Sequence, residues 1–238
     1  MLSSDRNTLP TSEELPCSDD TPVDNEDQNL LPNVLLFLLS TIWANRMDWY
    51  FGVDMAIYHT TGASPMPVVP DVFLSVGVER KKGGRSRRSY VVWEENEVVP
   101  ILTLEMVSHT AGGEYDDKLN IYARLGVLYY VVYNPEFWQR DGHQPFEVYK
   151  LVNGKYQLQI GEPYWMPEVR LGIGRCQMMF GNVVQQQLAW FDESGDRYLT
   201  AEERVGQERR EKEQERREKE RMAQYLRSLG IDPDRLPE

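Results

Sequence analysis

The sequence predicts an α+β fold in which helices flank a mixed β-sheet. Three observations predict it: apolar residues recur at helical spacing between 31 and 42, short apolar segments alternate with turn residues between 49 and 160, and Asn153-Gly154 separates two such segments. At 238 residues, 41% of them hydrophobic, the chain is long enough for one domain of ordinary size with additional tails.

Residues 1–28 are expected to form a disordered acidic tail. They hold eight acids and one arginine (1 − 8 = −7) together with Ser, Pro and Thr, and they show no apolar period. The tail carries more than half of the formal net charge of −12, so the remainder of the chain is only mildly acidic. An acidic net charge argues against binding to a polyanion such as nucleic acid. Without the tail this argument is weaker, but it still applies.

A first helix is expected to begin near Leu30 and to cover a sheet, because its apolar residues share one face: Leu31, Val34, Leu35, Leu38, Leu39 and Ile42. Strands are expected over 49–58, 68–78, 89–93 and 100–108. A second helix over 114–126 should end at its glycine, and a strand over 128–133 should follow it. Residues 146–152 and 155–160 should pair as a hairpin, because both positions of an Asn-Gly turn accept positive φ.

Residues 196–238 are expected to form a charged helix and tail beyond a domain spanning 29–195. The repeat ERREKEQ-ERREKER at 208–221 has the seven-residue period of a coiled coil but no apolar residue to form a seam. A solvated helix is favoured, held by the pairs Glu208–Lys212, Glu213–Arg217 and Glu215–Lys219. A small apolar face near its end could dock elsewhere; it consists of Met222, Tyr225, Leu226 and Leu229.

The cysteines, the N-terminus and the apolar runs favour a cytoplasmic protein. Cys17 and Cys176 lie far apart, and neither belongs to a CxxC pair or a histidine cluster that would suit zinc. No signal peptide is expected, and the most apolar run, about 11 residues over 34–44, is shorter than the roughly 20 of a membrane span. No membrane contact is therefore expected. Because no Gly-rich phosphate loop, GxSxG or HExxH motif occurs, no organic cofactor is expected either.

Glu105 is the residue that most needs an explanation. It lies within the apolar strand of PILTLEMVSHTAGGEYDDK, residues 100–118, and burial of an unpaired carboxylate is costly. One interpretation is purely structural: Glu105 pairs with a nearby cation such as Lys118. The other is chemical, and two further observations favour it.

Asp71 begins another apolar strand, so two neighbouring strands could present carboxylates at one place. Lys118 shares a helical face with Ile121, Tyr122 and Leu125, and therefore borders the apolar side of its helix. Two acids and an inward lysine are typical of a site in which Asp71 and Glu105 bind Mg²⁺, with Mn²⁺ as a substitute, while Lys118 orients or activates a water.

The segment ERKKGGRSRR, residues 79–88, carries six basic residues and two glycines. It reads equally well as an ordinary flexible loop and as a mobile arm that neutralises phosphates beside the metal site. In the second interpretation, five of its side chains contact nucleic acid: Lys81, Lys82, Arg85, Arg87 and Arg88.

Three stretches, VPDVFLSVGV, PILTLEMVSHTAGGEYDDK and IYARLGVLYYVVYNP, resemble the Uma2 family, which is abundant in cyanobacteria and is also described as DUF820-like. The resemblance covers roughly residues 30–190. It implies a restriction-endonuclease-like fold similar to the PD-(D/E)xK nuclease superfamily, whose members hydrolyse phosphodiester bonds with Mg²⁺. It also implies a homodimer.

On this resemblance, Asp71 matches the first motif acid and Glu105 the second. The usual motif lysine two positions later is Val107 here, and Lys118 on the following helix matches the lysine that replaces it in Uma2-like sequences. Met106 would offer its backbone carbonyl to the metal. A third carboxylate is not assigned: Asp48 and Asp54 are the substitutes, and Asp54 is expected to face solvent from its strand.

The sequence therefore predicts a Mg²⁺-dependent endonuclease that acts on DNA. Two other functions are also consistent with it. One is a catalytically silent nuclease-like fold that serves as an interaction module through its charged C-terminal helix. The other is a nucleic-acid binder that works through residues 79–88 without cleaving.

Overall fold

The computed structural model describes residues 9–18, 25–60, 66–109, 112–180, 182–230 and 232. The chain divides into two compact units, Met1–Arg197 and Tyr198–Glu238. No helix among the described residues combines the length and apolarity needed to cross a membrane. Within the described residues, Cys17 and Cys176 form no disulfide.

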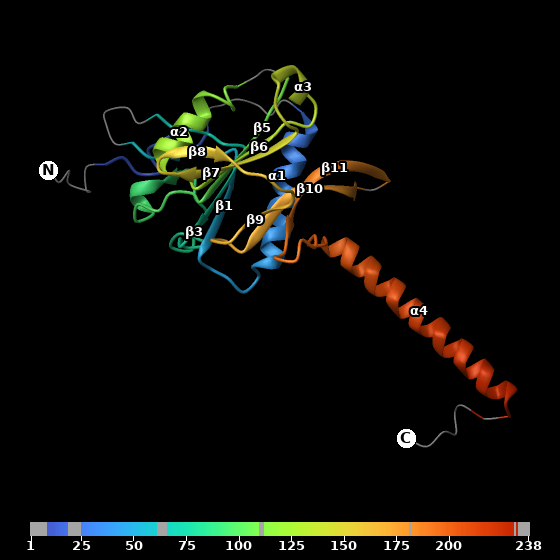
Figure 1. Ribbon diagram of the computed structural model, residues 1–238. Coiled ribbons are helices and arrows are strands. Elements are labelled where there is room, and N and C mark those ends of the chain that lie inside the picture. Colours follow the sequence, from blue (N-terminus) through green and yellow to red (C-terminus); the bar gives the residue numbers. More distant parts are fainter. Residues whose placement is uncertain are drawn as a thin grey trace. The chain divides into compact units, whose positions relative to one another are not determined.

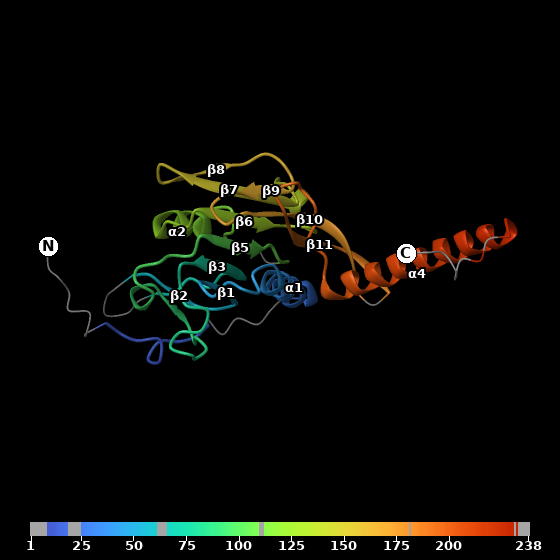
Figure 2. The same cartoon turned by 90° about the horizontal axis from the view of Figure 1, so that it is seen from below.

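The first unit is built on a six-stranded mixed sheet with the order β1-β3-β5-β6-β7-β8, which Figure 2 shows strand by strand. Its strands are β1 Trp49–Val53, β3 Val72–Val76, β5 Leu102–Met106, β6 Tyr129–Tyr133, β7 Phe146–Val152 and β8 Lys155–Leu158. Neighbours run antiparallel except β5 and β6, which are parallel and are connected through helix α2, Asp117–Leu125. The predicted α+β class with a mixed sheet flanked by helices is confirmed.

Helices cover the two faces of this sheet (Figure 1). Helix α1, Glu26–Ile42, begins at Asn25, whose side chain accepts a hydrogen bond from the Gln28 N–H. It packs on β1 and on a second sheet of order β11-β10-β9: β9 Tyr164–Met166, β10 Leu171–Phe180 and β11 Val183–Phe191. Helix α2 lies on the opposite face and ends at Gly126, whose φ of 89° is readily accessible to glycine.

Smaller elements complete the first unit. Strands β2, Ile57–Tyr58, and β4, Tyr90–Val91, pair in parallel, and a short 3₁₀ helix, Val92–Glu94, follows β4. The predicted segment 49–58 therefore divides into two strands. Helix α3, Trp138–Asp141, follows β6. The predicted hairpin at Asn153-Gly154 is confirmed, with φ values of 50° and 76° at its turn.

The predicted acidic tail does not extend to residue 28. Helix α1 begins at Glu26, and residues 9–18 contact the rest of the first unit. Leu15 is only 9% exposed, since it packs with Ala56, Tyr58 and Val91. An apolar anchor of one residue produces no periodic pattern, so composition alone could not reveal it. The parts of the predicted tail at 1–8 and 19–24 lie outside the described residues.

The second unit contains helix α4, Ala201–Ser228, which begins with a capping box between Thr200 and Glu203. No residue of α4 is buried within the described structure. The predicted ion pairs Glu213–Arg217 and Glu215–Lys219 form, at 3.0 and 3.5 Å. Met222, Tyr225 and Leu229 are all more than half exposed.

Candidate functional site

Strand β5 places Glu105 inside the first unit. All five residues of β5 are buried, and neighbouring strands pair with both of its edges, β3 antiparallel and β6 parallel. Glu105 lies in register with Val132 of β6, and only 1% of its surface is exposed. A carboxylate at this depth requires hydrogen-bonding or charged partners.

Helix α2 provides two of these partners. Lys118 Nζ donates to Glu105 Oε2 at 2.8 Å, and the Tyr122 hydroxyl donates to Glu105 Oε1 at 2.5 Å. Residues 118 and 122 lie one helical turn apart and therefore share a face. The helix consequently engages both oxygens of one carboxylate.

Asp71 lies beside Glu105. The pairing of Val72 with Leu104, continued by one residue, places Asp71 directly opposite Glu105 on the same face of the sheet. Asp71 Oδ2 accepts the N–H of Met106 at 2.5 Å. In an extended strand the N–H and the C=O of one residue point to the same side, so the Met106 carbonyl also points toward Asp71.

Burial and charge both act on these groups. Burial, followed by the charge of Glu105, raises the pKa of the Asp71 carboxyl well above its ordinary value, against the opposing effect of the Met106 N–H. Burial also raises the pKa of Glu105, against the lowering effect of Lys118. For Lys118, burial opposes the charged form, but the charge of Glu105 and its hydrogen bond prevail and raise the pKa.

The predicted metal ligands fit a hard divalent cation. Two carboxylates about 4 Å apart repel by about 4 kcal/mol at an effective dielectric of about 20, and a cation removes that repulsion. Among the described residues there is no cluster of three His, Cys, Asp or Glu side chains that could hold a metal. Mg²⁺ commonly binds through one or two carboxylates and retains water, so the oxygen donor types of Asp71, Glu105 and the Met106 carbonyl suit it.

Asp48 and Asp54, the two candidates for a third carboxylate ligand, lie at opposite ends of β1. Asp48 precedes β1 at its far end and forms an ion pair with Arg46 at 2.5 Å, so it lies away from Asp71. Asp54 follows β1 at the near end, and its N–H donates to the Asp71 carbonyl at 3.2 Å. Asp54 is exposed, as predicted, has a φ of 44°, and its charge contributes to the raised pKa of Asp71.

Tyr122 is the contact that sequence reasoning missed. The helical period predicts only that it lies on the apolar face of its helix, and its side chain is indeed fully buried. The signal was present in its position four residues after Lys118, which places both on the face that meets Glu105.

The basic segment, residues 79–88, does not lie beside Asp71. It follows the opposite end of β3, where the Gly77 N–H donates to the Asp48 carbonyl and the Arg80 N–H donates to the Met47 carbonyl. The prediction of an arm adjoining the metal ligands is therefore wrong. Five residues of strand, about 17 Å, separate the two ends.

The prediction that Arg87 contacts phosphate is also wrong. Its side chain is 2% exposed and donates twice to Glu95, at 2.9 Å each. Its guanidinium also lies over the Tyr50 ring, 4.5 Å from the centroid. Arg87 is a buried structural residue, and it differs from its neighbours because Glu95 reaches it from the next element of the chain.

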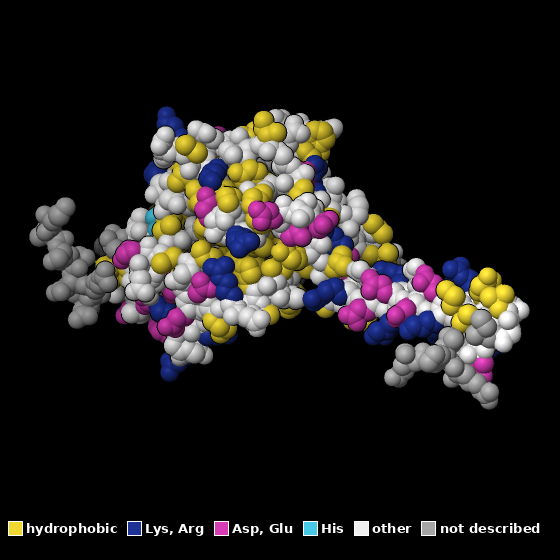
Figure 3. All heavy atoms as spheres, turned by 60° about the horizontal axis from the view of Figure 1, so that its bottom comes forward, with side chains coloured by type: hydrophobic (Ala, Val, Ile, Leu, Met, Phe, Trp, Pro, Cys, Tyr) yellow, Lys and Arg dark blue, Asp and Glu magenta, His cyan; other side chains and the backbone are white. Residues whose placement is uncertain are grey.

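The other bases of this segment are more exposed. Lys82 pairs with Glu94 at 2.8 Å and with Glu95 at 3.4 Å, and Arg88 pairs with Glu13 at 3.6 Å. Lys81 donates to the Ser86 hydroxyl, and Arg85 is exposed. On the face of the protein in Figure 3, the described Lys and Arg side chains lie among Asp and Glu rather than in one broad basic area.

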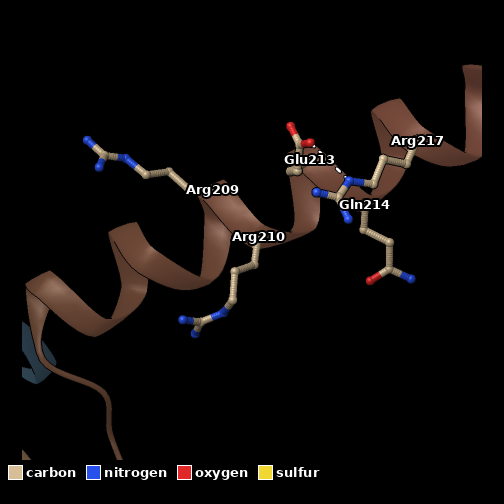
Figure 4. Close-up of a pocket in the computed structure, with 5 residues that line it drawn as sticks. All are labelled: Arg209, Arg210, Glu213, Gln214 and Arg217. Atoms are coloured by element: carbon tan, nitrogen blue, oxygen red, sulfur yellow. Dashed lines mark hydrogen bonds and ion pairs between the residues drawn. The ribbon is translucent and has the colours of Figure 1, made fainter.

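Helix α4 has a surface hollow of about 460 Å³, lined by Arg209, Arg210, Glu213, Gln214 and Arg217. Figure 4 shows these five side chains projecting from one helix, with Glu213 paired to Arg217. Because one helix lines it, the hollow is a groove between solvated side chains.

Comparisons with known proteins identify a family and one solved structure that this chain resembles. The family model Uma2, described as "Putative restriction endonuclease", matches residues 21–178. A crystal structure described as that of "a putative nuclease belonging to DUF820", from Anabaena variabilis ATCC 29413, is similar over 66% of this chain and 88% of its own, with 11% identity and a TM-score of 0.45. A similarity this distant supports no conclusion by itself. The comparison with curated proteins gives no match.

Proposed function

This chain belongs to the Uma2 family of restriction-endonuclease-like proteins, and on that basis we propose that it is a Mg²⁺-dependent endonuclease that hydrolyses phosphodiester bonds in DNA. One observation carries the proposal. Asp71, the residue before β3, lies opposite Glu105 of β5 by continuation of the strand register, and Lys118 of α2 donates to Glu105. This arrangement combines hard oxygen ligands with a positive charge, which phosphodiester hydrolysis requires.

Each residue has a distinct role. Asp71, Glu105 and the Met106 carbonyl would hold the cation. A bound Mg²⁺ would supply Lewis acidity, to polarise the phosphoryl oxygen and to lower the pKa of a water molecule. Lys118 places an ammonium group where negative charge develops on the attacking or phosphoryl oxygen. Tyr122 fixes the orientation of the Glu105 carboxylate through its hydroxyl.

A cleavage assay tests this function. Wild-type protein should nick or linearise plasmid DNA with Mg²⁺ or Mn²⁺ and not in EDTA, and Glu105→Gln should abolish the reaction while circular dichroism shows an intact fold. Glu147→Gln is the matched control, because Glu147 is also buried and also accepts a tyrosine hydroxyl, from Tyr149. Cleavage by Glu105→Gln at the wild-type rate would refute the assignment.

One observation favours a second function, that of a catalytically silent nuclease-like module. Both oxygens of Glu105 are engaged by side chains of α2, and Glu105 is 1% exposed, as expected of a purely structural ion pair. On this alternative neither Mg²⁺ nor Mn²⁺ binds, no DNA is cleaved, and partner capture depends on residues 200–238. Metal titration together with the cleavage assay distinguishes the two functions.

A further inference from the structure

Two oppositely charged segments of this chain, far apart in sequence, are in contact. Residues 9–18, here called the N-terminal strap, hold two acids and no base. They lie against the basic segment, residues 79–88, and the 3₁₀ helix that follows it. A contact between residues separated by 75 positions in the chain needs a physical cause.

The strap is attached to the body of the first unit by apolar and backbone contacts. Leu15 packs with Ala56, Tyr58 and Val91. The Ala56 N–H donates to the Cys17 carbonyl at 3.0 Å, and the Trp93 indole N–H donates to the Pro10 carbonyl, also at 3.0 Å. The attachment therefore rests on one buried side chain and a few hydrogen bonds, which a competing ligand can displace.

The charged contacts of the strap involve the groups that would bind phosphate. Arg88 Nη1 donates to the Glu13 carbonyl at 3.3 Å and lies 3.6 Å from the Glu13 carboxylate. Ser12 donates from its N–H and its hydroxyl to Glu94, and this carboxylate also accepts Lys82 Nζ at 2.8 Å. Residues 9–18 thus place the Glu13 carboxylate beside Arg88, whereas the acidic partners of Lys82, Glu94 and Glu95, lie outside the strap.

We propose that the N-terminal strap is a displaceable acidic cover that competes with the phosphates of a DNA duplex for Arg88. The pair of Glu13 and Arg88 is well exposed, at 74% and 55% of the side chains, so solvent and salt screen it and it is weak enough to exchange. This inference rests on the proposed function for the identity of the polyanion. The length of β3, roughly 17 Å, separates Asp71 from the start of the basic segment. A duplex advances 3.4 Å per base pair, so about five base pairs would span this distance.

The test measures DNA binding without metal, so that cleavage plays no part. A short fluorescent duplex is titrated in EDTA with full-length protein and with a variant lacking residues 1–18, at several salt concentrations. The truncated protein should bind several-fold more tightly at low salt, and the slope of log K against log salt should be steeper by about one for each additional phosphate contact. Unchanged or weaker binding with an unchanged slope would overturn the proposal.

Point variants guard against misfolding of the truncated protein. Leu15→Gln keeps the charge but places an amide in the apolar contact, and it should reproduce the tighter binding. Glu13→Gln removes the charge beside Arg88 and should tighten binding by about two-fold. Glu14→Gln is the matched control, because Glu14 accepts from Thr11 within the strap and should change binding less than Glu13→Gln. Equal effects of the two glutamine variants would contradict competition at Arg88.

Tryptophan fluorescence gives an independent readout. Duplex addition should shift the emission of wild-type protein to longer wavelength as Trp93 loses its contact with Pro10, and Trp93→Phe should remove the shift. If the truncated protein binds DNA more tightly but the wild type does not cleave, the proposed function fails and the strap inference stands. If Glu105→Gln abolishes cleavage but strap variants bind like wild type, the strap inference alone fails.

Discussion

Lys118 Nζ lies 2.8 Å from Glu105 Oε2 although the two residues belong to different elements, α2 and β5. The pair is asymmetric: Glu105 is 1% exposed, whereas the Lys118 side chain is 26% exposed. Lys118 therefore reaches from the edge of solvent to a buried carboxylate. The same contact serves folding and, in the proposed mechanism, charge stabilisation.

Lys118→Met should separate these two roles. Removal of the ammonium leaves Glu105 without its cation. Because Lys118 is partly exposed, we expect the free energy of unfolding to fall by about 1–3 kcal/mol, less than for a fully buried pair. Cleavage should fall by about 10²–10³-fold. Urea denaturation and the plasmid assay measure the two effects. Lys155→Met, on the exposed β8 strand, is the control, and equal losses in both variants would contradict the role of Lys118.

Tyr122→Phe should loosen Glu105 without removing any charge. The lost hydroxyl contributes about 1–2 kcal/mol to the free energy of unfolding, and its absence should weaken Mg²⁺ binding several-fold, since the carboxylate is less well oriented. Tyr130→Phe is the matched control, because its buried hydroxyl donates to the Glu114 carbonyl instead. Calorimetry that finds the same Mg²⁺ affinity in both variants would exclude the orienting role.

Asp71 makes stability depend on pH in a defined direction. Its pKa is raised in the folded state, so the unfolded chain releases this proton first as pH rises. Without metal, stability should fall from the ordinary pKa of an aspartate up to the raised folded value and then level off. Asp71→Asn, which still accepts the Met106 N–H, should lack this decline and be more stable than wild type at pH 7. Chemical denaturation from pH 4 to 8 measures the difference, and parallel curves would contradict the shift.

Arg87 provides the test of the corrected basic segment. Arg87→Met removes the two hydrogen bonds to the buried Glu95 and leaves it only the longer pair with Lys82, so the free energy of unfolding should fall by about 3–5 kcal/mol, measured by urea denaturation. DNA affinity of the folded fraction should not change. Arg85→Met, an exposed neighbour, should alter stability by no more than about 0.5 kcal/mol. A stability loss of similar size in both variants would place Arg87 at the surface.

The sequence was most informative where chemistry and local period coincide. An acid within an apolar strand, an acid at the start of another, and a lysine on the apolar side of a helix sufficed to predict that Asp71, Glu105 and Lys118 come together. Tyr122 escaped because a tyrosine at an apolar position is normally core. Its role depends on which strand residue the helix meets, and this is a long-range property.

Burial of individual charges was the other property that local pattern could not predict. Arg87 and Arg88 are adjacent and chemically identical. Yet Arg87 is buried and pairs with Glu95, whereas Arg88 pairs with Glu13 at the surface. Similarly, Leu15 anchors a segment whose composition is typical of disorder. The strands β9, β10 and β11 were not predicted either, since Gly172, Gly174 and the run of three glutamines interrupt the alternation expected of strands.

Calorimetric titration of Mg²⁺ into the wild type, Glu105→Gln and Glu147→Gln tests the central claim most directly. The account predicts saturable binding to the wild type and to the Glu147→Gln control, and none to Glu105→Gln. Equal binding to all three proteins, or no binding of Mg²⁺ or Mn²⁺ to the wild type, would contradict a metal site between Asp71 and Glu105.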